Sequence, residues 1–144
     1  MKQILFTFVS LVFASGFAAA QEIDATLYKK PGCVCCDSYA NYLRANGFHV
    51  TVIEPPNMTL IKQKYGVREN LASCHSTVIG NYVVEGHVPV GPIKKLLAEK
   101  PDIKGISLPG MPVGSPGMPG EKEGPFEILT ITGGEGPAPI YTKE

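Results

Sequence analysis

Residues 24–53, DATLYKKPGCVCCDSYANYLRANGFHVTVI, decide the fold of this chain. The segment opens with a short apolar strand pattern at 24–28, and a helical pattern covers residue 37 to about residue 45. Asn46-Gly47 is a typical helix stop, and the β-rich run 48–53 follows it directly. The sequence therefore predicts a strand, a helix and a second strand, with three cysteines where the first strand meets the helix.

The next part of the chain predicts a second half of different topology. A short helix is expected at 58–65. Two β-rich runs, 77–79 and 82–84, are separated only by Gly80-Asn81, which is a signal for a tight antiparallel hairpin. A last helix begins at Pro92 and ends before a further proline. A parallel βαβ half followed by an antiparallel ββα half is the thioredoxin-like arrangement within the α/β class.

The C-terminal third is rich in proline and glycine. Pro109–Pro112 and Pro116–Gly120 form an imperfect Pro-Gly-Met-Pro repeat that cannot be a regular helix or a central strand. A strand is expected at 126–131, and Ile140-Tyr141 can pair back on it. We interpret this part as an irregular extension of the same domain.

The N-terminus has the pattern of an export signal. Residues 1–20 contain one lysine, an apolar run and three alanines before Gln21. Cleavage after Ala20 would leave a single domain, residues 21–144, in the periplasm. The mature chain would hold 12 Lys+Arg (13 minus Lys2) against 13 Asp+Glu. This balance argues against nucleic-acid binding, and we expect no stable membrane insertion.

Three cysteines, Cys33, Cys35 and Cys36, lie within four positions. At the first turn of a helix, free backbone N–H groups favour the thiolate form of cysteine. Thiolate is both a metal ligand and a redox nucleophile, so this position suits either chemistry.

Further donors follow in the sequence. Cys74 and His75 precede the hairpin and His87 leaves it, so we expect all three near the first helix. Met111 and Met118 occupy matching positions in the repeat and are candidate thioether ligands. A set richer in sulfur than one tetrahedral zinc needs favours Cu(I), and excess thiolates can bridge several copper ions.

Other interpretations stay open. The four cysteines could form two structural disulfides, although the adjacent Cys35 and Cys36 are poorly placed for two good bridges. A structural zinc site is a second alternative. A third is a thiol–disulfide oxidoreductase, in which Cys33 is the attacking catalytic thiol and Cys36 the resolving one.

Three other polar residues have simpler expected roles. Tyr39 is expected to pack beneath the cysteine segment, and His49 to be an ordinary surface residue. Glu85 either orients His87 or is simply solvated.

Several ordered blocks of the sequence resemble a known family. These blocks are Cys33-x-Cys35-Cys36, Ser73–Ser76, Tyr82–Pro89 and Leu108–Met118. They look like the successive signatures of the CopG-type periplasmic copper-resistance family, a metal-binding family classed as a domain of unknown function. The resemblance covers about residues 24–120.

The resemblance implies a thioredoxin-like fold and a periplasmic role in copper resistance and copper homeostasis, with copper or thiol redox activity. It implies Cys33, Cys35, Cys36 and Cys74 as primary ligands of copper, with His75 and His87 as imidazole candidates. Periplasmic copper carriers or efflux proteins would be the partners. The sequence departs from the family pattern at Val34, Tyr39 and Arg68, where the family often has Gly, Trp and Pro, and none of these changes removes a donor atom.

Overall fold

The computed structural model describes residues 21–144, and the predicted signal segment 1–20 lies outside the described residues. The elements run in the order β1 (Ile23–Lys29), α1 (Val34–Ala45), β2 (Phe48–Ile53), α2 (Met58–Lys64), η1 (Glu69–Leu71), β3 (His75–Ile79), β4 (Tyr82–Glu85), α3 (Val90–Glu99), β5 (Gly105–Ser107), β6 (Glu127–Ile131) and β7 (Ile140–Lys143). The order of helices and strands predicted from the sequence up to α3 is therefore confirmed. None of the helices within residues 21–144 is long and apolar enough to span a bilayer.

All seven strands of the described chain form one sheet in the order β2-β1-β3-β4-β5-β6-β7. β1 and β2 are parallel, whereas β3 is antiparallel to both β1 and β4. These pairings are the predicted βαβ and ββα halves. In the register of the sheet, Lys29 at the end of β1 lies opposite His75 at the start of β3, which brings the cysteine segment next to Cys74.

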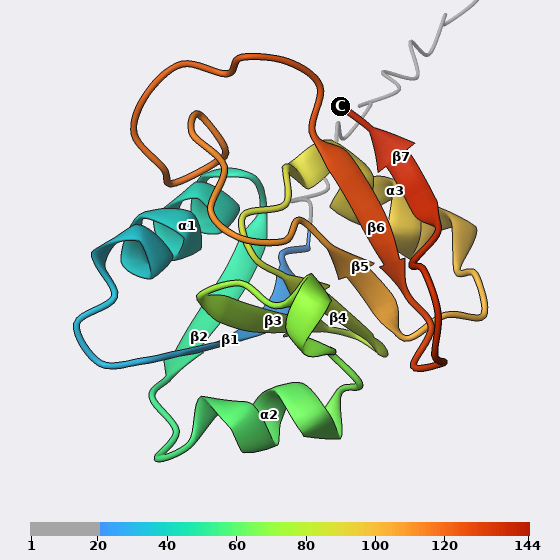
Figure 1. Ribbon diagram of the computed structural model, residues 1–144. Coiled ribbons are helices and arrows are strands. Elements are labelled where there is room, and N and C mark those ends of the chain that lie inside the picture. The colour runs from blue at the N-terminus through green and yellow to red at the C-terminus, as the bar shows by residue number, and fades with distance from the viewer. Residues whose placement is uncertain (1–20) are drawn as a thin grey trace, which may run out of the picture.

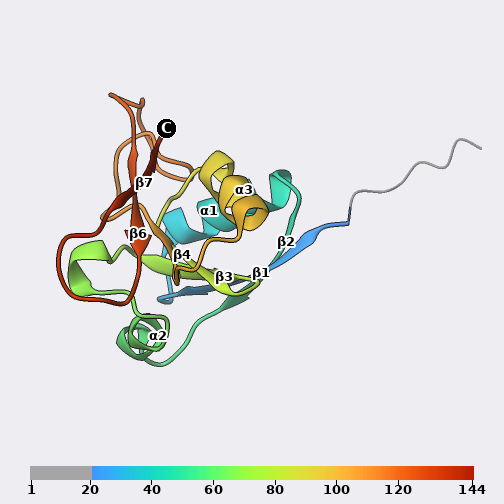
Figure 2. The same cartoon turned by 90° about the vertical axis from the view of Figure 1, so that its right-hand side faces the viewer.

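The helices cover both faces of the sheet. α1 and α3 lie on one face and α2 lies on the other, as two perpendicular views show (Figures 1 and 2). α1 turns Cys36, Tyr39, Ala40 and Leu43 toward the core, at the spacing of one helical face. The main core joins these residues to apolar side chains of β1, β2, β4, α3 and β6, including Leu27, Val50, Val84, Ile93, Leu96 and Ile128. The first turn of α1 is therefore held firmly over the sheet.

α1 begins earlier than the sequence predicts, at Val34 and not at Asp37. The apolar periodicity that marks this helix starts only at Tyr39, so its first turn gives no signal of its own. As a result Cys35 and Cys36 lie within the helix, and Cys33 is its N-cap residue.

The C-terminal extension is more regular than predicted, because it continues the sheet. β6 and the return strand β7 match the expected pairing, but β5 was not predicted. β5 has only three residues, all buried, and it joins β4 in parallel. A side chain at Gly105 would collide with the Val83 carbonyl, so this position needs glycine. A strand this short shows no periodicity in the sequence.

Candidate metal centre

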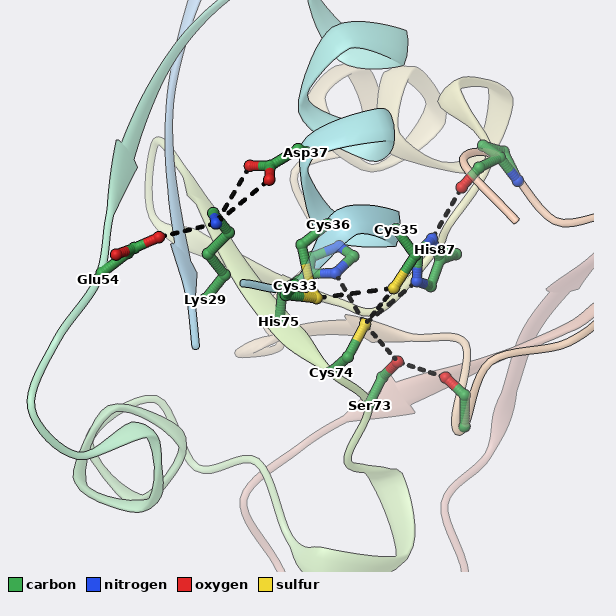
Figure 3. Close-up of a disulfide and its surroundings, with 12 residues drawn as sticks. Lys29, Cys33, Cys35, Cys36, Asp37, Glu54, Ser73, Cys74, His75 and His87 are labelled. Carbon is green, nitrogen blue, oxygen red and sulfur yellow. Dashed lines mark hydrogen bonds and ion pairs between the residues drawn. A yellow bond between two sulfur atoms is a disulfide. The ribbon is translucent and has the colours of Figure 1, made fainter. Parts of the chain in front are cut away.

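Three of the four sulfur atoms lie at the N-terminus of α1. The chain leaves β1, turns at Gly32, which has φ +71°, and enters the helix at Cys33. The sulfurs of Cys33 and Cys36 are joined in a disulfide, and their Cα atoms are 5.3 Å apart. Cys36 is buried, whereas Cys33 and Cys35 are partly exposed. The disulfide therefore joins the two cysteines that the sequence suggests as a redox pair, and Cys33 is its more accessible member (Figure 3).

The fourth sulfur comes from the loop between η1 and β3. Cys74 Sγ lies 3.9 Å from Cys35 Sγ, and Cys35 Sγ lies 3.6 Å from Cys33 Sγ. The four sulfur atoms all lie within 4.8 Å of one another. Cysteines 39 residues apart in sequence are therefore gathered in one cluster.

Two histidines extend the cluster on the side of Cys74. Its Sγ lies 3.2 Å from His75 Nδ1 and 3.1 Å from His87 Nε2. Cys74 thus belongs to both groups of potential ligands, the four sulfurs and the Cys-His-His set (Figure 3). A thiolate in this shared position can bridge two metal ions.

The tautomer of His87 is set by the C-terminal loop. Its Nδ1–H donates to the Pro116 carbonyl, with 2.8 Å between the two atoms. The lone pair is therefore on Nε2, which faces Cys74, and this is the usual way that a metal-binding histidine is oriented.

Burial keeps His75, His87 and Cys74 uncharged in the absence of metal. It lowers the pKa of His75 to about 3, with added repulsion from His87 and Lys62. Burial also lowers the pKa of His87, against the opposing bond to Pro116. Both imidazoles are therefore in the form that binds metals. Burial and the nearby Cys35 raise the pKa of the Cys74 thiol to about 11, so a metal must displace its proton on binding.

Glu85 has neither of the roles expected from the sequence, because it is fully buried and bonds elsewhere. It forms an ion pair with Lys62, accepts a hydrogen bond from Ser76 Oγ at 2.5 Å, and accepts one from the backbone N–H of Ser73 at 2.7 Å. Since Ser73 immediately precedes Cys74, this network anchors the loop that carries the fourth sulfur. The sequence around Lys62, which lies on α2, contains no pattern that predicts its contact with Glu85.

A buried cation, Lys29, anchors the other side of the cluster. Lys29 Nζ lies 3.2 Å from an Asp37 oxygen in α1 and 2.8 Å from a Glu54 oxygen after β2 (Figure 3). These two ion pairs tie the first turn of α1 to the ends of both parallel strands. Lys29 is only 4 % exposed, although its type and position gave no sign of burial.

Tyr39 packs beneath the cluster as expected and is fully buried. Its ring centroid lies 4.6 Å from that of His75 and 5.4 Å from that of His87, and its hydroxyl donates to the Val88 carbonyl at 2.8 Å. The exposed His49 lies outside the cluster and pairs with Asp24 at 3.0 Å. Both expectations are confirmed.

The two halves of the Pro-Gly-Met-Pro repeat reach the site through their glycines. Ser73 Oγ donates to the Gly110 carbonyl, and Gly117 lies directly against the backbone of α1 at Cys35 and Tyr39. Met111 and Met118 follow these glycines in the chain. Met111 is half-exposed and Met118 is partly buried. Their ligation of a metal stays a prediction.

A cavity of about 380 Å³ opens onto the cluster. Cys33 and Cys74 line it together with Thr59, Ser73 and Lys30. The buried Cys36 does not line this cavity. Small reactants can therefore reach Cys33 and Cys74 from solvent. A larger cavity of about 740 Å³ lies beside α2 and is lined by none of the predicted ligands.

Comparison with known proteins places this site in a family. The family model described as "Protein of unknown function, DUF411" matches residues 71–118, a range that contains Cys74, His75 and His87. No curated protein matches the chain. Two solved structures, described as "Copper resistance protein copG", Form 1 and Form 2, are each 36 % identical to it with a TM-score of 0.77. The matches cover 86 % of this chain and 98 % and 99 % of those chains.

These likenesses and the cysteine cluster support a copper-related role with copper ions as partners. The identity and the coverage together establish the relationship. This chain belongs to the CopG copper-resistance family.

Proposed function

We propose that this protein holds Cu(I) in the periplasm as a multi-copper thiolate cluster. The single observation that supports this most is the shared position of Cys74 Sγ, which lies within 4.8 Å of every donor atom in both ligand groups. Four sulfurs and two imidazoles exceed the four donors of one tetrahedral zinc site. Soft thiolate is the ligand type that Cu(I) prefers.

Copper loading depends on the redox state of the Cys33–Cys36 pair. In the disulfide form, only Cys35 and Cys74 remain as thiols. Thiol–disulfide exchange with an external dithiol, which is itself oxidised to a disulfide, converts the Cys33–Cys36 bond to two thiolates and completes the set of four sulfur ligands. In the reverse direction two thiolates can give two electrons to two Cu(II) ions, which become Cu(I). This couple is the proposed link between copper binding and Cu(I)/Cu(II) interconversion.

The remaining parts of the proposal concern location and additional ligands. We propose export with cleavage after Ala20, and N-terminal sequencing of the periplasmic protein tests this. Met111 and Met118 would add thioether donors from the loop that also supplies the Pro116 carbonyl to His87. Periplasmic copper carriers or efflux proteins would exchange copper with the site.

Anaerobic titration of the fully reduced protein with Cu(I), in competition with a Cu(I) chelator, tests the cluster. We expect more than one Cu(I) per chain, and a sharp loss of stoichiometry in both Cys36→Ser and Cys74→Ser. His49→Ala is the matched control, since this exposed histidine lies outside the cluster, and it should bind as the wild type does. Retention of full stoichiometry in both cysteine variants would contradict the proposal, as would a preference for a single zinc ion.

A thiol–disulfide oxidoreductase is the second candidate function. The bond between an accessible Cys33 and a buried Cys36 favours it, because a nucleophile can attack the first sulfur and release the second at the N-terminus of α1. Turnover of a small-molecule disulfide by the copper-free protein tests this reading. Catalysis that is lost in Cys33→Ser and kept in Cys74→Ser would support it, and no turnover by the wild type would remove it.

A further inference from the structure

The sulfur cluster contains a second pair of cysteines that the known disulfide leaves unused. Cys35 and Cys74 are the free thiols of the described chain, and both are partly exposed. Their Sγ atoms are 3.9 Å apart, which is close to van der Waals contact. One thiol lies on the first turn of α1, and the other lies on the loop before β3. A bond between them would join two elements that the disulfide at the N-terminus of α1 does not connect.

The helix explains how the adjacent Cys35 and Cys36 can serve different partners. Successive side chains of an α-helix point about 100° apart. Cys36 accordingly turns into the core, where it is fully buried and bonded to Cys33, while Cys35 turns toward Cys74. The helix therefore directs the two adjacent cysteines toward different partners, which is the condition that two bridges would require.

Only a small movement separates the free pair from a bond. A disulfide has an S–S distance of about 2 Å, so the two sulfurs must approach by roughly 2 Å. Rotation of the two side chains and adjustment of the irregular segment before β3 can supply this movement. The cavity that opens onto Cys74 also leaves the pair within reach of a small oxidant.

We propose that Cys35 and Cys74 form a second dithiol–disulfide couple, so that one reduced chain can give four electrons to Cu(II). Each couple releases two electrons and two protons, and the balanced step is four thiols plus four Cu(II) giving two disulfides, four Cu(I) and four protons. This inference rests on the proposed redox function of the site and assigns its electron capacity. It also links oxidation to release, because the second bond removes the last thiolate ligands and leaves the two imidazoles and the proposed thioethers of Met111 and Met118.

The first test needs no copper. Reduced, metal-free protein is oxidised with diamide, blocked with N-ethylmaleimide under denaturing conditions, and weighed intact. We expect a loss of about 4 Da and no maleimide adduct, since all four cysteines are bonded. After trypsin digestion, a cross-link should join the peptide 30–44 to the peptide 69–94. A loss of about 2 Da with two maleimide adducts, on Cys35 and Cys74, would overturn the inference.

The second test counts electrons. Reduced protein is mixed with excess Cu(II) under argon in the presence of a chromogenic Cu(I) chelator. We expect about four Cu(I) per wild-type chain and about two in Cys35→Ser and in Cys74→Ser, which keep the Cys33–Cys36 pair. Two Cu(I) per wild-type chain would overturn the inference.

The two proposals fail separately. Cu(I) titration of the reduced protein tests copper binding, whatever disulfides later form. The diamide experiment tests the second bond, whatever metal the site prefers. A chain that binds Cu(I) but keeps two free thiols after oxidation would retain the proposed function and lose this inference.

Discussion

The buried ion pair behind Cys74 gives the sharpest prediction about stability. Glu85 is fully buried, and the side chain of Lys62 is only 16 % exposed. Replacing Lys62 with methionine keeps the apolar stem but removes the cation, so Glu85 stays in the protein interior without its counter-ion. Removing one partner of a buried pair typically costs about 3–5 kcal/mol.

The expected loss for Lys62→Met lies below that range. Glu85 keeps two donors, the Ser73 N–H at 2.7 Å and Ser76 Oγ at 2.5 Å, and water can reach the space near the lysine end. We therefore expect a decrease of about 2–3 kcal/mol in the free energy of unfolding at neutral pH. With a urea m-value of about 1.5 kcal/mol per molar, the midpoint should fall by about 1.3–2 M.

The loss should also depend on pH. Burial raises the pKa of Glu85, and the Lys62 charge opposes this rise, so Lys62→Met raises the pKa further. A carboxyl group with a raised pKa in the folded state adds stability below its unfolded pKa, and this contribution is lost as pH rises through the folded pKa. Relative to the wild type, the variant should therefore be least impaired near pH 4 and most impaired near pH 8.

Urea unfolding of the copper-free protein, followed by circular dichroism at both pH values, measures these effects. Lys95→Met is the matched control, because Lys95 pairs with Glu99 on the surface, where both side chains are more than 40 % exposed. It should cost less than about 0.5 kcal/mol at either pH. The double variant Lys62→Met/Glu85→Gln should recover much of the loss by removing the buried charge. Equal, pH-independent losses in Lys62→Met and Lys95→Met would refute the reasoning.

Two further substitutions test how the site is supported. Tyr39→Phe removes the hydroxyl that donates to the buried Val88 carbonyl, and it should lower the free energy of unfolding by about 1–2 kcal/mol in urea titration; an unchanged midpoint would show that this bond contributes nothing. Gly117→Ala places a methyl group 2.8 Å from Tyr39 N, in a backbone with φ +83° that disfavours a side chain. We expect the variant to displace the loop from α1 and to lower the melting temperature. Because Pro116 in this loop orients His87, Cu(I) binding should also weaken. Gly124→Ala is its control, because a Cβ at that glycine meets nothing within 4 Å, and equal effects of the two variants would count against the loop's role.

Much of the fold could be predicted because its signals are local. Residues 48–53 alternate in burial as a strand should, and the bounds of β2 agree with the prediction. Asn57 caps α2 through a hydrogen bond from the Thr59 N–H to its side chain at 2.8 Å, as its residue type favours. Gly80-Asn81 connects β3 to β4 in the expected hairpin. The short buried β5 could not be predicted, since three residues carry no periodicity.

The sequence by itself determined which donor atoms this protein possesses and near which elements they lie. Only the tertiary structure decided how they are shared, with Cys74 between the sulfurs of α1 and the two imidazoles. The same holds for Lys62 and Glu85, which are 23 residues apart and meet only because α2 packs beside β3 and β4. The physical reason is that periodicity and capping act over a few residues. A ligand cluster or a buried ion pair depends instead on strand register and helix packing, which join segments far apart in the chain.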